Sequence, residues 1–198
     1  MSTDSEIIRR SLDEPGAFSQ IFERHVRAVG GYIRRRVGQD AVEDVLSETF
    51  LVAFRRRGSF DHVWESARPW LLGIATRLVR SHRAMEARQW RAFQASAGAG
   101  EAGGLPHDEA DEHLDAQAAL RELAPRIAAL SVKDRDTLLL YAWGDLDYAG
   151  IARALDVPIG TVRSRLNRAR RILRTAAGTN DPELEKEHGR VDAAAQHA

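Results

Sequence analysis

Residues 147–162 constrain the fold of this chain more than any other stretch, because their pattern suits one local structure. Asp147 can cap a short helix whose inner face would carry Ile151 and Leu155. A turn follows, and Pro158, whose φ angle is already set for a helix, can open a second helix. The order of cap, short amphipathic helix, turn and helix predicts a helix-turn-helix.

The second helix of this unit is amphipathic and strongly basic. Between Ile159 and Arg174 the chain has six arginines and no acidic residue. A helical wheel places Val162 and Leu166 on the core side. In the major groove arginine reads guanine and asparagine reads adenine, while arginine and threonine also suit phosphates. The residues expected to bind DNA are Thr161, Arg163, Ser164, Arg165, Asn167, Arg168 and Arg171.

The first half of the chain also has helical spacing, without the sustained alternation that is typical of strands. An apolar stripe from Phe18 to Ile33 predicts a long helix, and the glycine pair at Gly30 predicts a kink or a close helix contact within it. Asp40 is expected to cap a second helix, and Pro69 suits the first turn of a third. The inward residues expected on these two helices are Val42, Val45, Leu46, Thr49, Ala53, Trp70, Leu71, Ile74 and Leu78.

A further helix is expected before the helix-turn-helix. Ser131 and Asp134 resemble a capping box at its start, and Gly144 suits its end. Its expected apolar anchors are Leu138, Leu139 and Tyr141.

We therefore predict an all-α protein of two small helical domains joined by a flexible linker, with the helix-turn-helix in the second domain. The expected ranges are 10–92 for the first domain, 93–117 for an acidic linker, 118–177 for the second domain and 178–198 for a disordered acidic tail. The net charge of zero hides an uneven distribution: +4 for residues 1–95, −6 for 96–118, +5 for 119–178 and −3 for 179–198. Two basic blocks separated by an acidic one favour a nucleic-acid partner.

The composition and the missing motifs exclude several other classes of protein. The chain has no cysteine, so disulfide scaffolds, thiolate metal sites and cysteine catalysis are excluded. The histidines have no metal-binding spacing, and there is no phosphate-binding glycine loop or nucleophile motif. Neither a signal peptide nor an apolar run of membrane length is evident. We expect a cytoplasmic protein without membrane insertion, metal, cofactor or catalytic residues.

Two separate parts of the chain resemble one known family. Residues 157–170 (VPIGTVRSRLNRAR) look like the end of the fourth domain of bacterial sigma factors of the sigma-70 family, especially the extracytoplasmic-function (ECF) group. Residues 130–140 resemble the preceding helix of that domain. Residues 44–55 (DVLSETFLVAFR) resemble the family's core-polymerase-binding helix, and residues 69–75 (PWLLGIA) the start of its promoter-melting helix.

The resemblance implies a transcription initiation factor without catalytic activity of its own. Its partners would be core RNA polymerase, promoter DNA and, as an option, an anti-sigma factor. The basic helix would read the minus-thirty-five element. The residues implied in core polymerase binding are Asp44, Glu48, Leu51 and Arg55. Those implied at the minus-ten element are Phe60, Trp64, Arg77, Arg80 and Arg83.

Aromatic and cationic side chains suit single-stranded bases, but packing of Phe60 and Trp64 onto their own domain is an open alternative. The chain also departs from the family pattern. Thr76-Arg77 stands where Arg-Asn is usual, and Gly150 replaces a glutamate in the first helix of the helix-turn-helix. Both changes bear on promoter specificity more than on fold.

Three other functions fit the sequence less well. An enzyme is disfavoured by the missing motifs. An ordinary helix-turn-helix repressor or activator would explain residues 119–175 and leave the first domain without a role. A protein-binding adaptor would bind without the steep salt dependence that phosphate contacts produce.

Overall fold

The computed structural model describes residues 2–96 and 125–175, and these residues form helices and connecting turns without a strand. The predicted all-α class is confirmed. Most of the expected linker (93–117) and nearly all of the expected tail (178–198) lie outside the described residues; the first four linker positions continue a helix that ends at Ser96.

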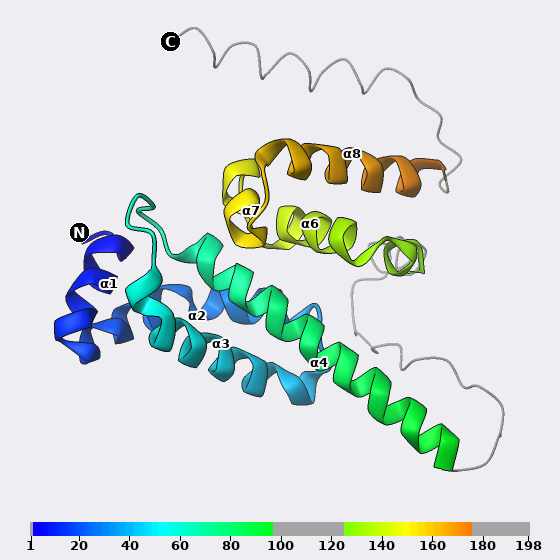
Figure 1. Cartoon of the computed structure of the whole chain (residues 1–198), viewed down its shortest axis with the longest axis horizontal. Helices are drawn as coiled ribbons and strands as arrows, with labels where there is room; N and C mark the ends of the chain where they lie inside the picture. The colour runs from blue at the N-terminus through cyan, green and yellow to red at the C-terminus, as the bar shows by residue number, and fades with distance from the viewer. Residues whose placement is uncertain (1, 97–124, 176–198) are drawn as a thin grey trace, which may run out of the picture.

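The first domain contains four α-helices joined by short 3₁₀ turns (Figure 1). They are α1 (Asp4–Asp13), η1 (Pro15–Phe18), α2 (Ser19–Arg34), η2 (Gln39–Ala41), α3 (Val42–Arg56), η3 (Arg57–Ser59) and α4 (Arg68–Ser96).

Helix α1 was not expected from the sequence and begins before residue 10, the expected start of the domain. Thr3 and Glu6 form a reciprocal capping box at its start, in which the Thr3 hydroxyl accepts from the Glu6 N–H and the Glu6 carboxylate accepts from the Thr3 N–H. Ile7 and Ile8 are fully buried, so two adjacent apolar residues anchor the helix. Thr3 followed three residues later by Glu6 is the sequence signal that could have predicted this helix.

Helix α2 confirms the expected stripe, with Ile21, Val29 and Ile33 fully buried. It runs through the glycine pair without interruption, and a Cβ on Gly30 would lie 3.6 Å from Leu46 of α3. The glycine therefore marks a close helix contact rather than a kink.

The expected cap of the next helix at Asp40 is wrong. Asp40 lies inside the turn η2, whose N-cap is Gly38, and α3 starts after Ala41 without a side-chain cap. The turn itself leads the chain into α3, so no capping side chain is needed. The expected inward residues of α3 are buried, except that Leu46 is only partly so.

The second domain contains a helical stretch at 125–129, followed by α6 (Val132–Trp143), α7 (Tyr148–Leu155) and α8 (Ile159–Thr175). The Ser131 hydroxyl accepts from the Asp134 N–H, as expected, but the Asp134 carboxylate accepts from that hydroxyl rather than from the backbone. Tyr141 was expected as an anchor and is 41% exposed, while Leu140 is fully buried in its place. Tyr141 instead contacts Tyr148 and the guanidinium of Arg170.

The helix-turn-helix is present at the expected place. Asp147 caps α7 by accepting from the Gly150 N–H at 2.7 Å. Asp156 takes the left-handed conformation (φ 54°, ψ 56°), and the Val157 N–H donates to the Ala152 carbonyl at 3.0 Å. This turn lets α8 leave α7 at a sharp angle.

The two domains pack directly on each other. Helix α4 crosses the molecule, with α2 and α3 on one side and α6, α7 and α8 on the other (Figure 1). A Cβ on Gly73 of α4 would lie 2.4 Å from the carbonyl oxygen of Ala154 in α7, so only glycine permits this approach. Because α4 is covered from two sides, Leu71, Leu72, Ala75 and Val79 are all fully buried.

Candidate nucleic-acid interface

The outer face of α8 carries the polar and basic residues that the wheel predicted. Val162, Leu166 and Ala169 are at most 1% exposed and hold the helix against the domain. The residues exposed on the other face are Arg163, Ser164, Asn167, Arg168 and Arg171. Thr161 and Arg165 lie half-buried at its margins. The arrangement is a rigid, positively charged helix face of the kind that enters a major groove.

Arg168 has a partner that the sequence did not suggest. Its Nη1 lies 3.1 Å from Oδ1 of Asp134, at the start of α6. Asp134 is buried, and half of the Arg168 side chain (52%) remains exposed. Holding one guanidinium nitrogen limits the conformations of a long side chain before it meets DNA, which lowers the entropy lost on binding.

The exposed face of α3 brings together the four residues expected to bind polymerase. Asp44, Glu48, Leu51 and Arg55 are spaced at i, i+4, i+7 and i+11, and all four are exposed. Leu51 is 41% exposed, an apolar side chain among charged ones. Such a mixed stripe on one helix suits docking against another protein surface.

The two aromatic candidates in the loop between η3 and α4, Phe60 and Trp64, have different surroundings. Phe60 is 4% exposed and packs edge-on against His62 and Trp70. We therefore assign Phe60 to the core instead of to a base-holding surface. Trp64 is half-buried, and Val63 beside it is 88% exposed. Val63 was not singled out from the sequence, because one valine in a polar loop has no distinguishing pattern.

Trp64 also lines a groove between the two domains. The groove has a volume of about 520 Å³, and its other walls come from α7, the turn and the start of α8. They are formed by Ala149, Ala152, Arg153, Asp156, Val157, Pro158 and Ile159. Arg153 reaches the loop from α7, with its Nη1 3.6 Å from the Asp61 carboxylate.

The three arginines expected at the minus-ten element lie along α4 in different surroundings. Arg77 and Arg83 are exposed, whereas Arg80 is half-buried. Partial burial, together with the nearby charges of Arg56 and Arg80, lowers the pKa of Arg77 below its usual value; the charge of Asp156 opposes this. Arginine starts so far above neutrality that Arg77 remains a cation.

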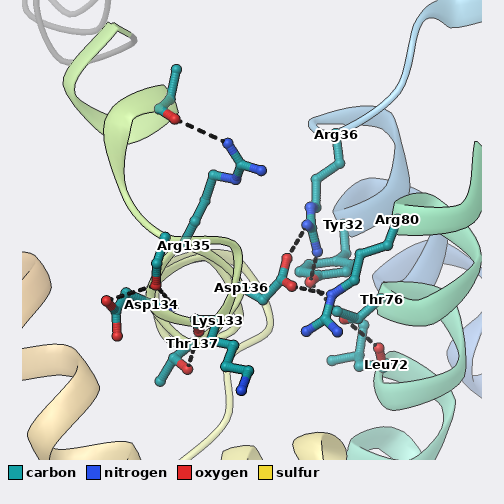
Figure 2. A network of polar contacts seen from close by, with 12 residues as sticks. Tyr32, Arg36, Leu72, Thr76, Arg80, Lys133, Asp134, Arg135, Asp136 and Thr137 are labelled. Atoms are coloured by element: carbon teal, nitrogen blue, oxygen red, sulfur yellow. Dashed lines mark hydrogen bonds and ion pairs between the residues drawn. The ribbon is translucent and has the colours of Figure 1, made fainter. Parts of the chain in front are cut away.

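Arg80 is engaged by the other domain. Asp136 of α6 is fully buried and accepts hydrogen bonds from both Arg80 and Arg36 (Figure 2). Arg36 also donates to the Tyr32 hydroxyl, which lies 2.8 Å from the Thr76 hydroxyl. Burial raises the pKa of Tyr32, so its phenol stays neutral and can donate onward.

Thr76 closes this chain of contacts by donating to the Leu72 carbonyl at 2.7 Å. Thr76 is thus buried (1% exposed), and its hydroxyl joins the α4 backbone to the polar network that faces Asp136.

No group of histidine, aspartate and glutamate side chains that could hold a metal ion occurs among residues 2–96 and 125–175. Within those same ranges no helix has the length and apolar character needed to cross a membrane.

Comparison with known proteins decides the family. The family model for Sigma-70 region 2 matches residues 21–89, and that for Sigma-70, region 4 matches residues 115–173. The RNA polymerase sigma factor HrpL of Pseudomonas syringae pv. syringae is 33% identical over 163 residues, which cover 81% of this chain and 87% of HrpL. The chain belongs to the ECF group of sigma-70 factors. This sigma factor is also 29% identical over 179 residues to the ECF RNA polymerase sigma-E factor of Escherichia coli (strain K12), covering 86% and 92% of the two chains.

Solved structures share the fold of this sigma factor. CnrH in complex with the cytosolic domain of CnrY has a TM-score of 0.61 at 20% identity, covering 90% of this chain and 99% of the other. The sigma factor RpoE of Bartonella quintana, in complex with the anti-sigma factor NepR, has a TM-score of 0.56 at 22% identity, covering 83% and 98%.

Membership of the family makes this sigma factor a promoter-specific transcription initiation factor that works with RNA polymerase. The structure gathers its expected DNA-reading and polymerase-binding residues on separate exposed faces of α8 and α3. Sequence reasoning missed the long-range contacts of Asp134 with Arg168, of Asp136 with Arg36 and Arg80, and of the first turn of α1 with the loop before α4.

Proposed function

We propose that α8 reads the minus-thirty-five element through the exposed residues around Asn167 and Arg168. The observation that carries this proposal is that the α8 face opposite Val162 and Leu166 is exposed and has no acidic residue. Arg168, positioned by Asp134, is the best candidate for a base contact, because a bidentate arginine needs a defined orientation. Thr161, Arg163, Ser164, Arg165 and Arg171 would add phosphate and groove contacts.

We propose further that the exposed stripe of α3 (Asp44, Glu48, Leu51 and Arg55) binds core polymerase. The loop at 58–67 and the α4 arginines would act at the minus-ten element, with Val63 and Trp64 against an unstacked base and Arg77, Arg80 and Arg83 toward the backbone. Polymerase would supply the catalysis and this chain the specificity. Since both partners are cytoplasmic, we place its action there.

Run-off transcription with core polymerase lacking a sigma subunit, followed by mapping of start sites, tests this assignment. The wild-type protein should direct initiation from defined start sites. An Arg168→Ala variant should lower output from those sites, while Lys133→Ala, which removes an exposed cation from α6, should leave it unchanged. Equal losses in the two variants would mean that α8 acts only through general charge.

We also propose an anti-sigma factor as a regulatory partner of this chain. CnrH and RpoE, which share its fold, are each recorded in complex with another protein, in the case of RpoE the anti-sigma factor NepR. The groove between the loop and the helix-turn-helix offers Trp64, Val157 and Ile159 to an apolar segment. Such a partner should lower run-off transcription by the wild-type protein and bind a Trp64→Ala variant more weakly.

A further inference from the structure

The first turn of α1 is fastened to the loop that precedes α4, although the two are some sixty residues apart in the sequence. The backbone N–H groups of Asp4 and Ser5 both point at the carbonyl of Glu65, at 3.0 and 3.4 Å. The Ser5 hydroxyl donates to the His62 carbonyl at 3.2 Å and lies 3.0 Å from its Nδ1. The second half of the loop is therefore held from α1 at several points.

Asp4 is the centre of this attachment. Its Oδ2 accepts from the backbone N–H of Ala67 at 2.9 Å and from Nε2 of His25 at 2.6 Å. Its Oδ1 accepts from Nη1 of Arg24 at 2.9 Å. Asp4 is 6% exposed, and Ala67 is fully buried. One buried side chain thus joins three segments: α1, α2 and the end of the loop.

The attachment stops where the loop turns outward. Val63 and Trp64 lie between the held residues His62 and Glu65, and Val63 is 88% exposed. The tip forms its own turn, in which the Val63 N–H donates to the Asp61 carboxylate and the Trp64 N–H to the Asp61 carbonyl, both at 3.2 Å. The Trp64 ring also packs against the core, so Val63 is the fully exposed member of the tip. The loop therefore has a fixed base and an exposed apolar tip.

We propose that Asp4 is a positioning residue for promoter opening, which sets the loop 62–67 so that Val63 and Trp64 can receive an unstacked base. This inference rests on the proposed role of that loop at the minus-ten element. Asp4 itself is buried on the inner side and acts through the backbone of the loop. A displacement of about 1 Å in a group that holds a reacting partner can reduce activity by about a hundredfold, so loss of the attachment should be visible in opening.

The test compares Asp4→Ala with Asp13→Ala, which removes an exposed carboxylate from the other end of the same helix. Run-off transcription is measured on a promoter mapped with the wild-type protein, as intact duplex and with mismatched strands across the minus-ten element. We expect Asp4→Ala to lose about tenfold on the duplex and much less on the pre-opened template. Affinity for core polymerase should stay within about twofold of the wild type, because α3 is untouched.

Ser5→Ala distinguishes an effect on the loop from a simple folding defect of Asp4→Ala. It removes one hydroxyl that contacts His62 and leaves the buried carboxylate of Asp4 in place. Ser5→Ala should also lose more run-off transcription on the duplex than on the pre-opened template, but the loss should be smaller than for Asp4→Ala. Equal behaviour of Asp4→Ala and Asp13→Ala on both templates would overturn the inference, and so would losses of the same size on duplex and pre-opened DNA.

A variant of the loop tip distinguishes failure of this inference from failure of the proposal on which it rests. Val63→Ala with Trp64→Ala should impair opening if the loop holds a base. If the tip variant opens the promoter as well as the wild type, the proposed role of the loop fails. If the tip variant is impaired and Asp4→Ala is not, the loop works without positioning by Asp4.

Discussion

Asp136 of α6 lies fully buried between the two domains, where its carboxylate accepts a hydrogen bond from Arg80 of α4. The same carboxylate pairs with Arg36, whose side chain is 2% exposed. Arg80 is also a residue proposed to contact promoter DNA, so the contact between the domains and the contact with DNA compete for one guanidinium. Two promoter elements about two helical turns apart are separated by roughly 70 Å. We therefore predict that the packed domains separate when both elements are bound.

Asp136→Ala should weaken the contact between the domains. Arg36 would then be a buried cation without its carboxylate, and breaking a buried pair costs about 3–5 kcal/mol. Small-angle scattering of the free protein should report a larger radius of gyration. The control is Asp145→Asn, which removes another ion pair between the domains, Arg68–Asp145, whose carboxylate side is 85% exposed. Asparagine tolerates the positive φ (51°) of this position, so the backbone is not strained. Exposed pairs contribute about 0–1 kcal/mol, so an equally large expansion in the control would contradict the importance of Asp136.

Gly73→Ala should separate the domains by a steric route. The added Cβ would lie 2.4 Å from the Ala154 carbonyl oxygen, a distance that backbone atoms cannot tolerate. Within α4 itself, alanine is favoured over glycine by about 1 kcal/mol. Scattering should show expansion, whereas Gly31→Ala, where an added Cβ meets nothing within 4 Å, should leave the domains packed. A compact Gly73→Ala protein would mean that α4 and α7 can shift without separating.

Arg168→Ala should reduce specific binding at the minus-thirty-five element more than nonspecific binding. A bidentate base contact contributes about 1–3 kcal/mol of discrimination, roughly 5- to 150-fold. Competition binding of the holoenzyme to promoter and random DNA measures the difference. If Arg168 contacts only phosphate, both affinities should fall equally and the salt dependence should become shallower.

Leu166→Ala, two residues away on the opposite side of α8, should lower the stability of the fold. Leu166 is 1% exposed in the core of the second domain. Truncating a buried leucine costs about 2–5 kcal/mol of unfolding free energy. Urea denaturation followed by circular dichroism should show this loss, while Arg168→Ala should unfold close to the wild type.

The stability of the first domain should depend on the ionisation of Asp4. Burial alone would raise the pKa of this carboxyl, but hydrogen bonds from His25, the Ala67 N–H and Arg24 outweigh it and lower the pKa to about 2. Because the folded pKa lies below the unfolded value of 3.8, the stabilisation is complete above about pH 4 and is lost as the pH falls toward 2. It amounts to about 2 kcal/mol.

Asp4→Asn should therefore lower the unfolding free energy at pH 5 and flatten its dependence on pH between 4 and 2. Urea titrations at several pH values measure this, with Asp13→Asn as the exposed control. An unchanged slope in Asp4→Asn would show that other carboxylates govern acid unfolding.

The sequence alone determined helices α2, α3, α4, α6, α7 and α8, the helix-turn-helix and the two faces of α8, whereas α1 was missed. These are local properties: a cap such as Asp147 and a stripe such as Val162, Leu166 and Ala169 depend on residues within one or two turns. The family resemblance likewise rested on contiguous motifs. The exposed stripe of α3 was likewise predicted from one contiguous motif, and its residues are exposed as expected.

Tertiary structure decided which of the candidate residues are exposed and can contact a partner. Phe60 and Trp64 stand four positions apart in one loop, yet packing against Trp70 buries the first and leaves the second half-exposed. Asp136 pairs with Arg36 one hundred residues earlier, and Asp4 holds Ala67 across sixty-three. Hydrogen bonds of buried charges are set by which helices pack together, and no local spacing encodes that choice.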